Sequence, residues 1–194
     1  MTAARRVLDY LATTPTLGLQ YTIGNPELTC YVDASWADDK DTRRTRYGFA
    51  IYLGNNLIAW RSKLHPSIAL STAEAEYIAA SQATKTIKYL RYLLKELGIP
   101  QNKPTILYED NEACIAMTKN KMVTGRSKHI ELKQHYVREQ VGLNNIELQY
   151  ISTKLQRADL LTKNLPRPTF ESLRQQLMQP TTNHRHDVNK NTGS

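Results

Sequence analysis

The chain has 194 residues, which is enough for one domain with extensions and a substantial buried core. Its 26 lysines and arginines outnumber its 18 acidic residues, and the resulting formal charge of +8 favours a nucleic-acid partner. Cys30 and Cys114 have neither metal-ligand spacing nor a disulfide framework, so we expect buried thiols in a reducing, intracellular setting. We expect no transmembrane helix and no secretory signal.

The first half of the chain is predicted to hold a short helix, three strands and a long helix. An amphipathic helix opens the sequence and ends at Thr13-Thr14-Pro15, because proline rarely continues a helix. Asn55-Asn56 separates the second and third strands, which predicts that they are antiparallel neighbours. The strands are expected at 28–36, 47–53 and 57–63. The long helix is expected at 71–97 and ends at Gly98.

The second half alternates strands with helices and ends in a polar tail. The expected order is a strand at 105–108, a helix at 111–119, a polar loop at 122–128, a helix at 130–141, a strand at 146–151, a helical region at 156–163 and a helix at 169–178. Residues 179–194 lack apolar periodicity, so we expect them to be disordered. Antiparallel strands followed by alternating strands and helices predict a mixed α/β sheet with helices on its faces.

Asp33 and Asp110 are acidic residues in or beside predicted strands, where a charge against the core is costly unless it is paired or binds a metal. Asp33 interrupts an apolar strand, in which aspartate is disfavoured, so it is either exposed at an edge or functional. Asp110 follows a strand, at the end where α/β sheets collect ligand sites. Its alternative role is to cap the helix that begins at Asn111.

Glu76 is the third acidic candidate and lies on the apolar stripe of the long helix. The stripe proceeds in steps of three and four residues, as expected for a face that packs on a core: Leu97, Leu94, Leu90, Ile87, Ala83, Ala80 and then position 76. The alternative for Glu76 is a first-turn acid that the helix dipole favours. Glu74 is instead expected to complete a capping box with Ser71. We expect the Glu74 side chain on a face shared with Lys85 and Lys88.

Asp159 completes a set of four acidic candidates, although alone it would be an ordinary helix-surface aspartate. Together, carboxylates from four different elements of a basic chain predict a site for hard divalent cations, which prefer oxygen ligands. Two such ions stabilise the attacking and leaving oxygens of a phosphoryl displacement. The sequence has no glycine-rich phosphate loop and no histidines with zinc-ligand spacing, which argues against kinase-like and zinc-hydrolase chemistry.

Five segments, taken in order, resemble the motifs of one family. They are Tyr31-Val32-Asp33-Ala34-Ser35-Trp36-Ala37, Leu70-Ser71-Thr72-Ala73-Glu74-Ala75-Glu76-Tyr77, Tyr108-Glu109-Asp110-Asn111, Lys128-His129-Ile130 and Ala158-Asp159-Leu160-Leu161-Thr162-Lys163. Over residues 3 to 178 the chain resembles the ribonuclease H domain of copia-type LTR-retrotransposon Pol polyproteins. The opening segment at 5–11 and Gly18-Leu19 resemble the end of the preceding reverse transcriptase. We therefore expect a fragment of a longer polyprotein or a truncated reading frame.

The resemblance implies a ribonuclease H-like α/β fold, with a five-stranded mixed sheet whose first three strands are antiparallel and whose faces carry helices. It assigns the catalytic and metal-binding quartet of the family to Asp33, Glu76, Asp110 and Asp159. We expect the quartet to hold two Mg²⁺ ions, with Mn²⁺ as a possible substitute, and to direct water onto a phosphodiester. The expected substrate is the RNA strand of an RNA–DNA hybrid, which its 2′-hydroxyl distinguishes. The reaction would be an endonucleolytic cut during reverse transcription.

Several further residues are expected to contact the nucleic acid: Ser35, Arg43, Arg44, Ser71, Thr72, Asn111 and His129. For the arginines, the alternative is an ordinary solvated surface. Many ribonucleases H carry a histidine in a mobile loop before the last aspartate, but the corresponding segment 151–157 contains none. His129 is a candidate substitute in space, and a structural histidine is the alternative.

The resemblance also predicts domains, partners and location. The expected divisions are the end of the reverse transcriptase with a connector at 1–26, the ribonuclease H-like domain at 27–165, a C-terminal helix at 166–178 and the tail at 179–194. The expected partners are an RNA–DNA hybrid and the reverse transcriptase domain of the same polyprotein, with no membrane. The expected location is the cytoplasm, in a virus-like particle if the element is intact, with the nucleus as an alternative.

Two alternatives to an active ribonuclease H remain open. A decayed element would leave a catalytically inactive, nucleic-acid-binding remnant with the same fold. Another nuclease of the superfamily, such as an integrase or a proofreading exonuclease, would use acids in a different order and spacing.

Overall fold

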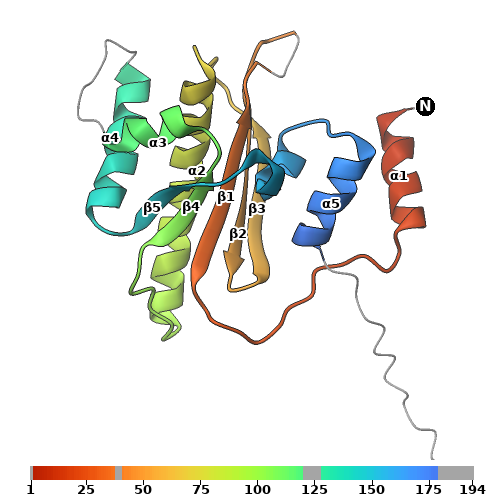
Figure 1. Cartoon of the computed structure of the whole chain (residues 1–194), viewed down its shortest axis with the longest axis horizontal. Coiled ribbons are helices and arrows are strands. Elements are labelled where there is room, and N and C mark those ends of the chain that lie inside the picture. The colour runs from red at the N-terminus through yellow and green to blue at the C-terminus, as the bar shows by residue number, and fades with distance from the viewer. Residues whose placement is uncertain (1, 38–40, 120–127, 179–194) are drawn as a thin grey trace, which may run out of the picture.

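The computed structural model describes residues 2–37, 41–119 and 128–178 (Figure 1). For residues 128–132 and 134 it describes the backbone alone. The predicted disordered tail and nearly all of the predicted polar loop at 122–128 lie outside the described residues. Among the described helices, none is both long and apolar enough to cross a membrane.

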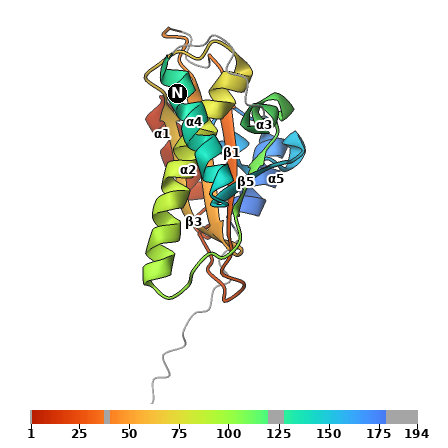
Figure 2. The same cartoon turned by 90° about the vertical axis from the view of Figure 1, so that its left-hand side faces the viewer.

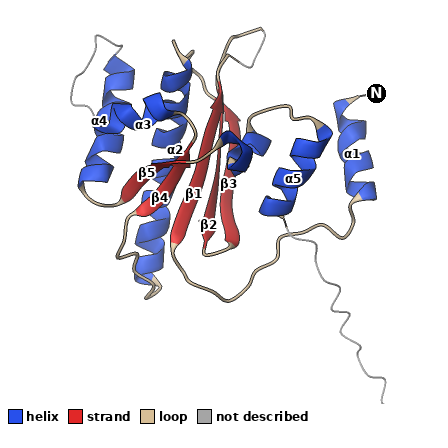
Figure 3. Cartoon of the chain, in the orientation of Figure 1, coloured by secondary structure: helices blue, strands red, loops and turns tan. Residues whose placement is uncertain are grey.

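The sheet has five strands in the order β3-β2-β1-β4-β5, which confirms the predicted mixed α/β architecture. The strands are β1 (Leu28–Ser35), β2 (Arg46–Leu53), β3 (Asn56–Leu64), β4 (Thr105–Glu109) and β5 (Ile146–Tyr150). β1, β2 and β3 are antiparallel neighbours, whereas β4 runs parallel to β1 and β5 runs parallel to β4. The sheet therefore changes from antiparallel to parallel pairing at β1, the central strand (Figure 3).

Helices cover both faces of this sheet (Figure 2). They are α1 (Ala3–Thr13), α2 (Thr72–Glu96), α3 (Glu112–Lys119), α4 (Lys128–Gly142) and α5 (Arg167–Leu177), with two 3₁₀ turns at Thr153–Leu155 and Arg157–Leu161. α2 packs on β1 and β2, and α4 packs along α2. The second 3₁₀ turn and α5 lie on the opposite face of the sheet. α1 contacts α5 through the edge-to-face pair of Tyr10 and Phe170.

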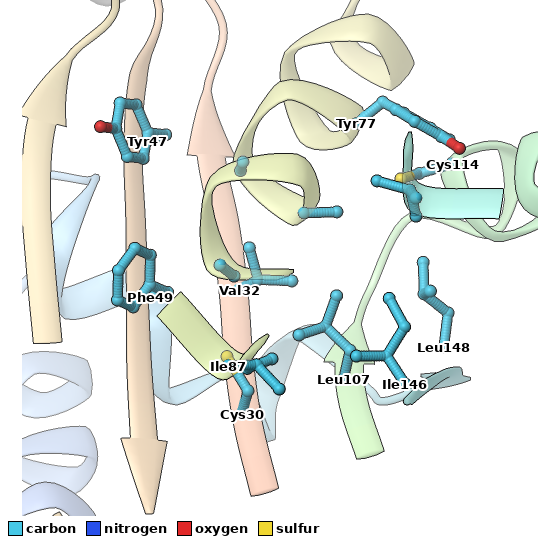
Figure 4. Close-up of a cluster of buried hydrophobic side chains, with 14 of the residues drawn as sticks. Cys30, Val32, Tyr47, Phe49, Tyr77, Ile87, Leu107, Cys114, Ile146 and Leu148 are labelled. Atoms are coloured by element: carbon cyan, nitrogen blue, oxygen red, sulfur yellow. The ribbon is translucent and has the colours of Figure 1, made fainter. Parts of the chain in front are cut away.

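The main core fills the space between the sheet and α2 (Figure 4). Alternate residues of β1 point into it, including Val32, and Ile87 of α2 meets them from the apolar stripe that the sequence predicts. Cys30 and Cys114 are free, buried thiols within this core, as expected. Successive side chains of β1 point to opposite faces of the sheet, so Tyr31 points away from this core. Asp33, two residues later, lies on the same face as Tyr31.

Glu74 lies in the first turn of α2, as expected, and its side chain is buried. Ser71 Oγ accepts a hydrogen bond from the Glu74 backbone N–H at 3.2 Å, which is one half of the predicted capping box. The Glu74 side chain is only 2 % exposed, which the sequence did not predict. The reason is tertiary, because α4 packs along α2 and places Lys133 near the Glu74 carboxylate.

The C-terminal elements also differ from their predicted form. Within the expected helical region at 156–163 the structure has one short 3₁₀ turn, Arg157–Leu161, which begins where the Gln156 side chain accepts a hydrogen bond from the Ala158 N–H. The last helix begins at Arg167 rather than at residue 169. Proline is tolerated in the first turn of a helix, where its missing N–H has no helical partner to lose, so Pro168 does not delay the start.

Candidate active site

The site lies where two parallel strands stop pairing. The β1–β4 ladder ends at the pair Tyr31 and Tyr108, so Asp33 and Asp110 each follow two residues later. Beyond the ladder, the Gln156 Nε2 group donates hydrogen bonds to the Val32 carbonyl at 2.9 Å and to the Tyr108 carbonyl at 3.3 Å. Gln156 thus bridges the two strand ends and satisfies carbonyls that have left the ladder.

Three of the predicted acids converge at this point. Asp33, Glu76 and Asp110 each offer a carboxylate oxygen, and these oxygens lie within 4.8 Å of one another. Asp33 is fully buried, Glu76 is nearly so, and Asp110 is partly exposed. Glu76 Oε2 is buried without a hydrogen-bond partner. Burial, followed by the neighbouring charges of Glu109 and Asp33, raises the pKa of Glu76 well above its ordinary value.

The fourth predicted acid, Asp159, is buried beside Asp33 in the turn Arg157–Leu161. Lys163 Nζ lies 2.9 Å from Asp33 Oδ1 and 2.7 Å from Asp159 Oδ1. Burial, and then the charge of Asp33, raises the pKa of Asp159 to about 6. The structure therefore places three of the acids in one oxygen cluster and joins the fourth to it through a lysine.

Gly48 lets the turn carrying Asp159 approach the sheet. Gly48 of β2 pairs with Asp33 in the antiparallel ladder. A Cβ atom at Gly48 would lie 2.7 Å from Leu161 Cβ and 2.9 Å from Thr162 Cγ2, closer than packed carbon atoms allow. The absent side chain makes room for Thr162, whose hydroxyl donates a hydrogen bond to Asp33 Oδ2.

The turn after β4 decides between the two roles considered for Asp110. Asn111, rather than Asp110, caps α3, because Asn111 Oδ1 accepts a hydrogen bond from the Cys114 N–H at 3.0 Å. Glu109 Oε1 accepts one from the Asn111 N–H at 3.0 Å and so braces the same turn. The capping alternative for Asp110 was therefore wrong, and its carboxylate faces Asp33 and Glu76.

Sequence reasoning missed four residues of this site: Glu109, Gln156, Thr162 and Lys163. Glu109 is fully buried, and burial raises the pKa of its carboxyl group. Its signal was an acid at the end of an apolar strand, the same signal that identified Asp110. The other three act through contacts with β1 that span more than 120 positions, such as the one between Gln156 and Val32, and no local pattern reveals them.

The predicted nucleic-acid contacts are spread around the same end of the sheet. Ser35 ends β1 and pairs with Arg46, and the exposed Arg43 and Arg44 lie just before that residue. Thr72 is exposed at the start of α2, one turn before Glu76. Ser71 and Asn111 use their side-chain oxygens as helix caps, so part of their hydrogen-bonding capacity is structural. The His129 side chain lies outside the described residues.

Comparison with curated proteins adds an independent observation. The chain is 39% identical over 169 residues to the retrovirus-related Pol polyprotein from transposon TNT 1-94 of Nicotiana tabacum, covering 87% of this chain. It is 37% identical over 171 residues to the Pol polyprotein from transposon RE1 of Arabidopsis thaliana, covering 88% of this chain. The chain is homologous to copia-type retrotransposon Pol polyproteins. It spans 13% and 12% of the lengths of these two polyproteins. No protein-family model matches it.

Solved structures with the same architecture place this Pol segment in the ribonuclease H-like fold. One is LC11-RNase H1, isolated from compost by a metagenomic approach, with a TM-score of 0.53 and 16% identity over 70% of this chain and 92% of that chain. Another is the foamy viral protease-reverse transcriptase in complex with an RNA/DNA hybrid, with a TM-score of 0.53 and 12% identity. That match covers 79% of this chain and 22% of the viral chain. The predicted ribonuclease H-like fold is therefore confirmed.

Proposed function

We propose that this Pol segment is a metal-dependent ribonuclease H that hydrolyses the RNA strand of RNA–DNA hybrids. The observation that carries the proposal is the buried oxygen cluster of Asp33, Glu76 and Asp110. Homology to Pol polyproteins supports it. So does the ribonuclease H-like fold, because a neighbour with this fold is a reverse transcriptase in complex with a hybrid.

The residues present fit divalent ions of the magnesium type. Hard cations take oxygen ligands, and the cluster offers carboxylate oxygens from three separate elements, including a Glu76 oxygen that is buried without a hydrogen-bond partner. Asp33, Glu76 and Asp110 would hold one ion, and Asp33 with Asp159 would hold the second. When bound, paired Mg²⁺ ions lower the pKa of a water molecule and stabilise the attacking and leaving oxygens of the phosphodiester.

The chain itself supplies positioning for this reaction. Thr162 and the β1–β2 ladder fix Asp33, the residue shared by both proposed ion sites. Gln156 holds the ends of β1 and β4 at a constant spacing, and Glu109 braces the turn that presents Asp110. Arg43 and Arg44 add positive charge at the same end of the sheet, where phosphates of the hybrid would bind. Preorganised charged and polar groups of this kind reduce the barrier to reaction.

The biological setting follows as part of the proposal. Within a Pol polyprotein, the segment would remove template RNA during reverse transcription, next to the reverse transcriptase domain of the same polyprotein. It would act in the cytoplasm, inside a virus-like particle, or in the nucleus.

A cleavage assay tests the proposed activity. The full 194-residue chain is incubated with Mg²⁺ and a hybrid whose RNA strand carries an internal label, and the products are resolved on a denaturing gel. We expect internal cuts in the RNA, loss of cutting with Asp110→Asn, and normal cutting with Asp9→Asn, a matched change at an exposed position of α1. Intact RNA would indicate the inactive remnant. Cleavage of duplex DNA, or digestion only from ends, would indicate another nuclease of the superfamily.

A further inference from the structure

Lys163 gives the acidic cluster a cation of its own. Its ammonium group contacts Asp33 Oδ1 at 2.9 Å and Asp159 Oδ1 at 2.7 Å, and both carboxylates are almost completely buried. The ammonium group lies between the two acids that would hold a second metal ion.

The lysine is fixed to this position by its own turn. The Lys163 backbone N–H donates a hydrogen bond to the Asp159 carbonyl at 3.0 Å, so the two residues lie one helical turn apart on the same short segment. The neighbouring Thr162 hydroxyl binds the other oxygen of Asp33. Because the turn that supplies Asp159 also supplies Lys163, any ion that uses Asp159 meets this ammonium group.

An open groove beside Lys163 provides room for the side chain to move. The groove has a volume of about 270 Å³ and is lined by Arg46, Ser62, Leu160, Leu161, Thr162, Lys163 and Asn164. No carboxylate is among these lining residues, and Arg46 adds a second positive charge. Movement of the ammonium group into the groove would therefore break its ion pairs with Asp33 and Asp159 and place it where no carboxylate replaces them. This movement costs free energy.

We propose that Lys163 is an internal counter-cation that competes with a divalent ion for Asp33 and Asp159. The inference rests on the proposed function, because it assumes that the cluster binds metal. Asp33, Glu76 and Asp110 can then bind a first ion while Lys163 keeps its contact with Asp159. A second ion binds between Asp33 and Asp159 only when it displaces the ammonium group, so its apparent affinity is lower. Lys163 thus sets the ion concentration at which the site fills.

Counting bound Mn²⁺ by electron paramagnetic resonance and calorimetry tests whether the first ion binds more tightly than the second. In the wild-type chain we expect two binding steps of clearly different affinity. Lys163→Met removes the charge at similar length and should tighten the second step by about tenfold or more, the equivalent of one hydrogen bond to a charged group. Lys163→Arg keeps the charge and should resemble the wild type. Lys154→Met removes an exposed charge from the preceding turn and controls for net charge.

Thermal unfolding supplies a second readout that does not depend on cleavage. Without metal, Lys163→Met should melt below the wild type, because two buried carboxylates lose their shared partner. Saturating Mn²⁺ should then raise its melting temperature by more than it raises that of the wild type. If the methionine variant does not fold, Lys163→Gln removes the charge while keeping a hydrogen-bond donor, and the same tightening is expected of it.

The outcomes separate this inference from the proposed function. A wild-type chain that binds two Mn²⁺ ions and cuts RNA, with an unchanged or weaker second step in Lys163→Met, would refute the role of Lys163 alone. A wild-type chain that binds no Mn²⁺ and leaves the hybrid intact would refute the proposed function, and the role of Lys163 with it. A selectively tighter second step in the uncharged variants, together with the lower metal-free melting temperature, supports the competition.

Discussion

The two sides of Asp33 balance their negative charge in different ways. Toward α2 and β4, Asp33 meets Glu76 and Asp110, and burial with neighbouring charges raises the pKa of Glu76. Toward the turn Arg157–Leu161, it meets Asp159 across the ammonium group of Lys163. Both sides are buried and acidic, yet only the second has a cation from the same chain in direct contact with its pair of acids, among the described residues.

The difference indicates that the two sides contribute differently to folding and to function. Carboxylates that face one another in a buried place destabilise the metal-free protein, and a bound ion relieves that cost. In the proposed competition, the pair of acids that shares Lys163 already has a positive partner, which a second ion must displace. Under the proposed function, the cluster therefore joins one side that would take an external cation to a second side that already contacts Lys163.

The largest expected effect comes from the residue that both sides share. Asp33→Asn removes a ligand from each proposed ion site, so we expect cleavage of the hybrid to fall by about 10³-fold or more. The rate is measured under single-turnover conditions with saturating Mg²⁺. Asp9→Asn serves as the matched exposed control. Near-normal cleavage by Asp33→Asn would show that the cluster is not the reactive centre.

A substitution at Gly48 should disturb one side and leave the other in place. The Cβ atom of Gly48→Ala would meet Leu161 and Thr162 on the turn that carries Asp159 and Lys163, and it would have no such contact with α2. We expect a loss of about 1–3 kcal/mol in the free energy of unfolding, as for other overpacked positions, and weaker binding of the second Mn²⁺ ion.

The matched control is Gly142→Ala, because a Cβ atom at Gly142 has no neighbour within 4 Å. Urea denaturation measures the stability difference, and Mn²⁺ titration measures ion binding. Equal loss at both ion sites in Gly48→Ala would mean that the two sides do not respond separately.

Gln156 links the two sides, so its removal should weaken both. Gln156→Ala leaves the carbonyls of Val32 and Tyr108 without the donor that now bridges them. Loss of a partner from buried polar groups costs about 1–3 kcal/mol, and we expect unfolding measurements to show a loss in this range. Gln149→Ala, at a partly exposed position of β5, is the control. An unchanged unfolding midpoint would indicate that the strand ends do not depend on the bridge.

The smallest effect concerns a charge outside the cluster. Burial lowers the pKa of His65 below 6.5, and the charges of Lys133 and Lys85 act in the same direction, although a hydrogen bond with Ser67 opposes them. His65 therefore binds a proton more readily in the unfolded chain than in the folded chain. Its contribution to stability is complete above pH 6.5 and decreases as the pH falls below that value.

Urea denaturation at pH 7.5 and pH 5.5 measures this dependence of stability on pH. His65→Gln should reduce this pH dependence, whereas His135→Gln, at an exposed position of α4, should not. If the pH dependence of stability is unchanged in His65→Gln, it arises from other groups, such as the acids of the cluster.

The sequence predicted the strands and three of the acids well because their signals are local. Apolar runs set β1 to β5 to within one residue at every end, and helical phase placed Glu76 on the core side of α2. The burial of Glu74 was missed because it depends on α4, which packs along α2 from a distant part of the sequence. Lys163 and Gly48 were missed because each acts through contacts between the last turn and the sheet, which exist only when that turn has packed.

The bridge formed by Gln156 has a consequence for how the protein is completed during synthesis. Asp33, Glu76 and Asp110 all precede β5, so a ribosome releases the first three acids well before it releases Gln156. Until that residue emerges, the carbonyls of Val32 and Tyr108 lack their common donor. A nascent or proteolysed chain that stops short of residue 156 therefore lacks the clasp between β1 and β4, in addition to the acid that follows it.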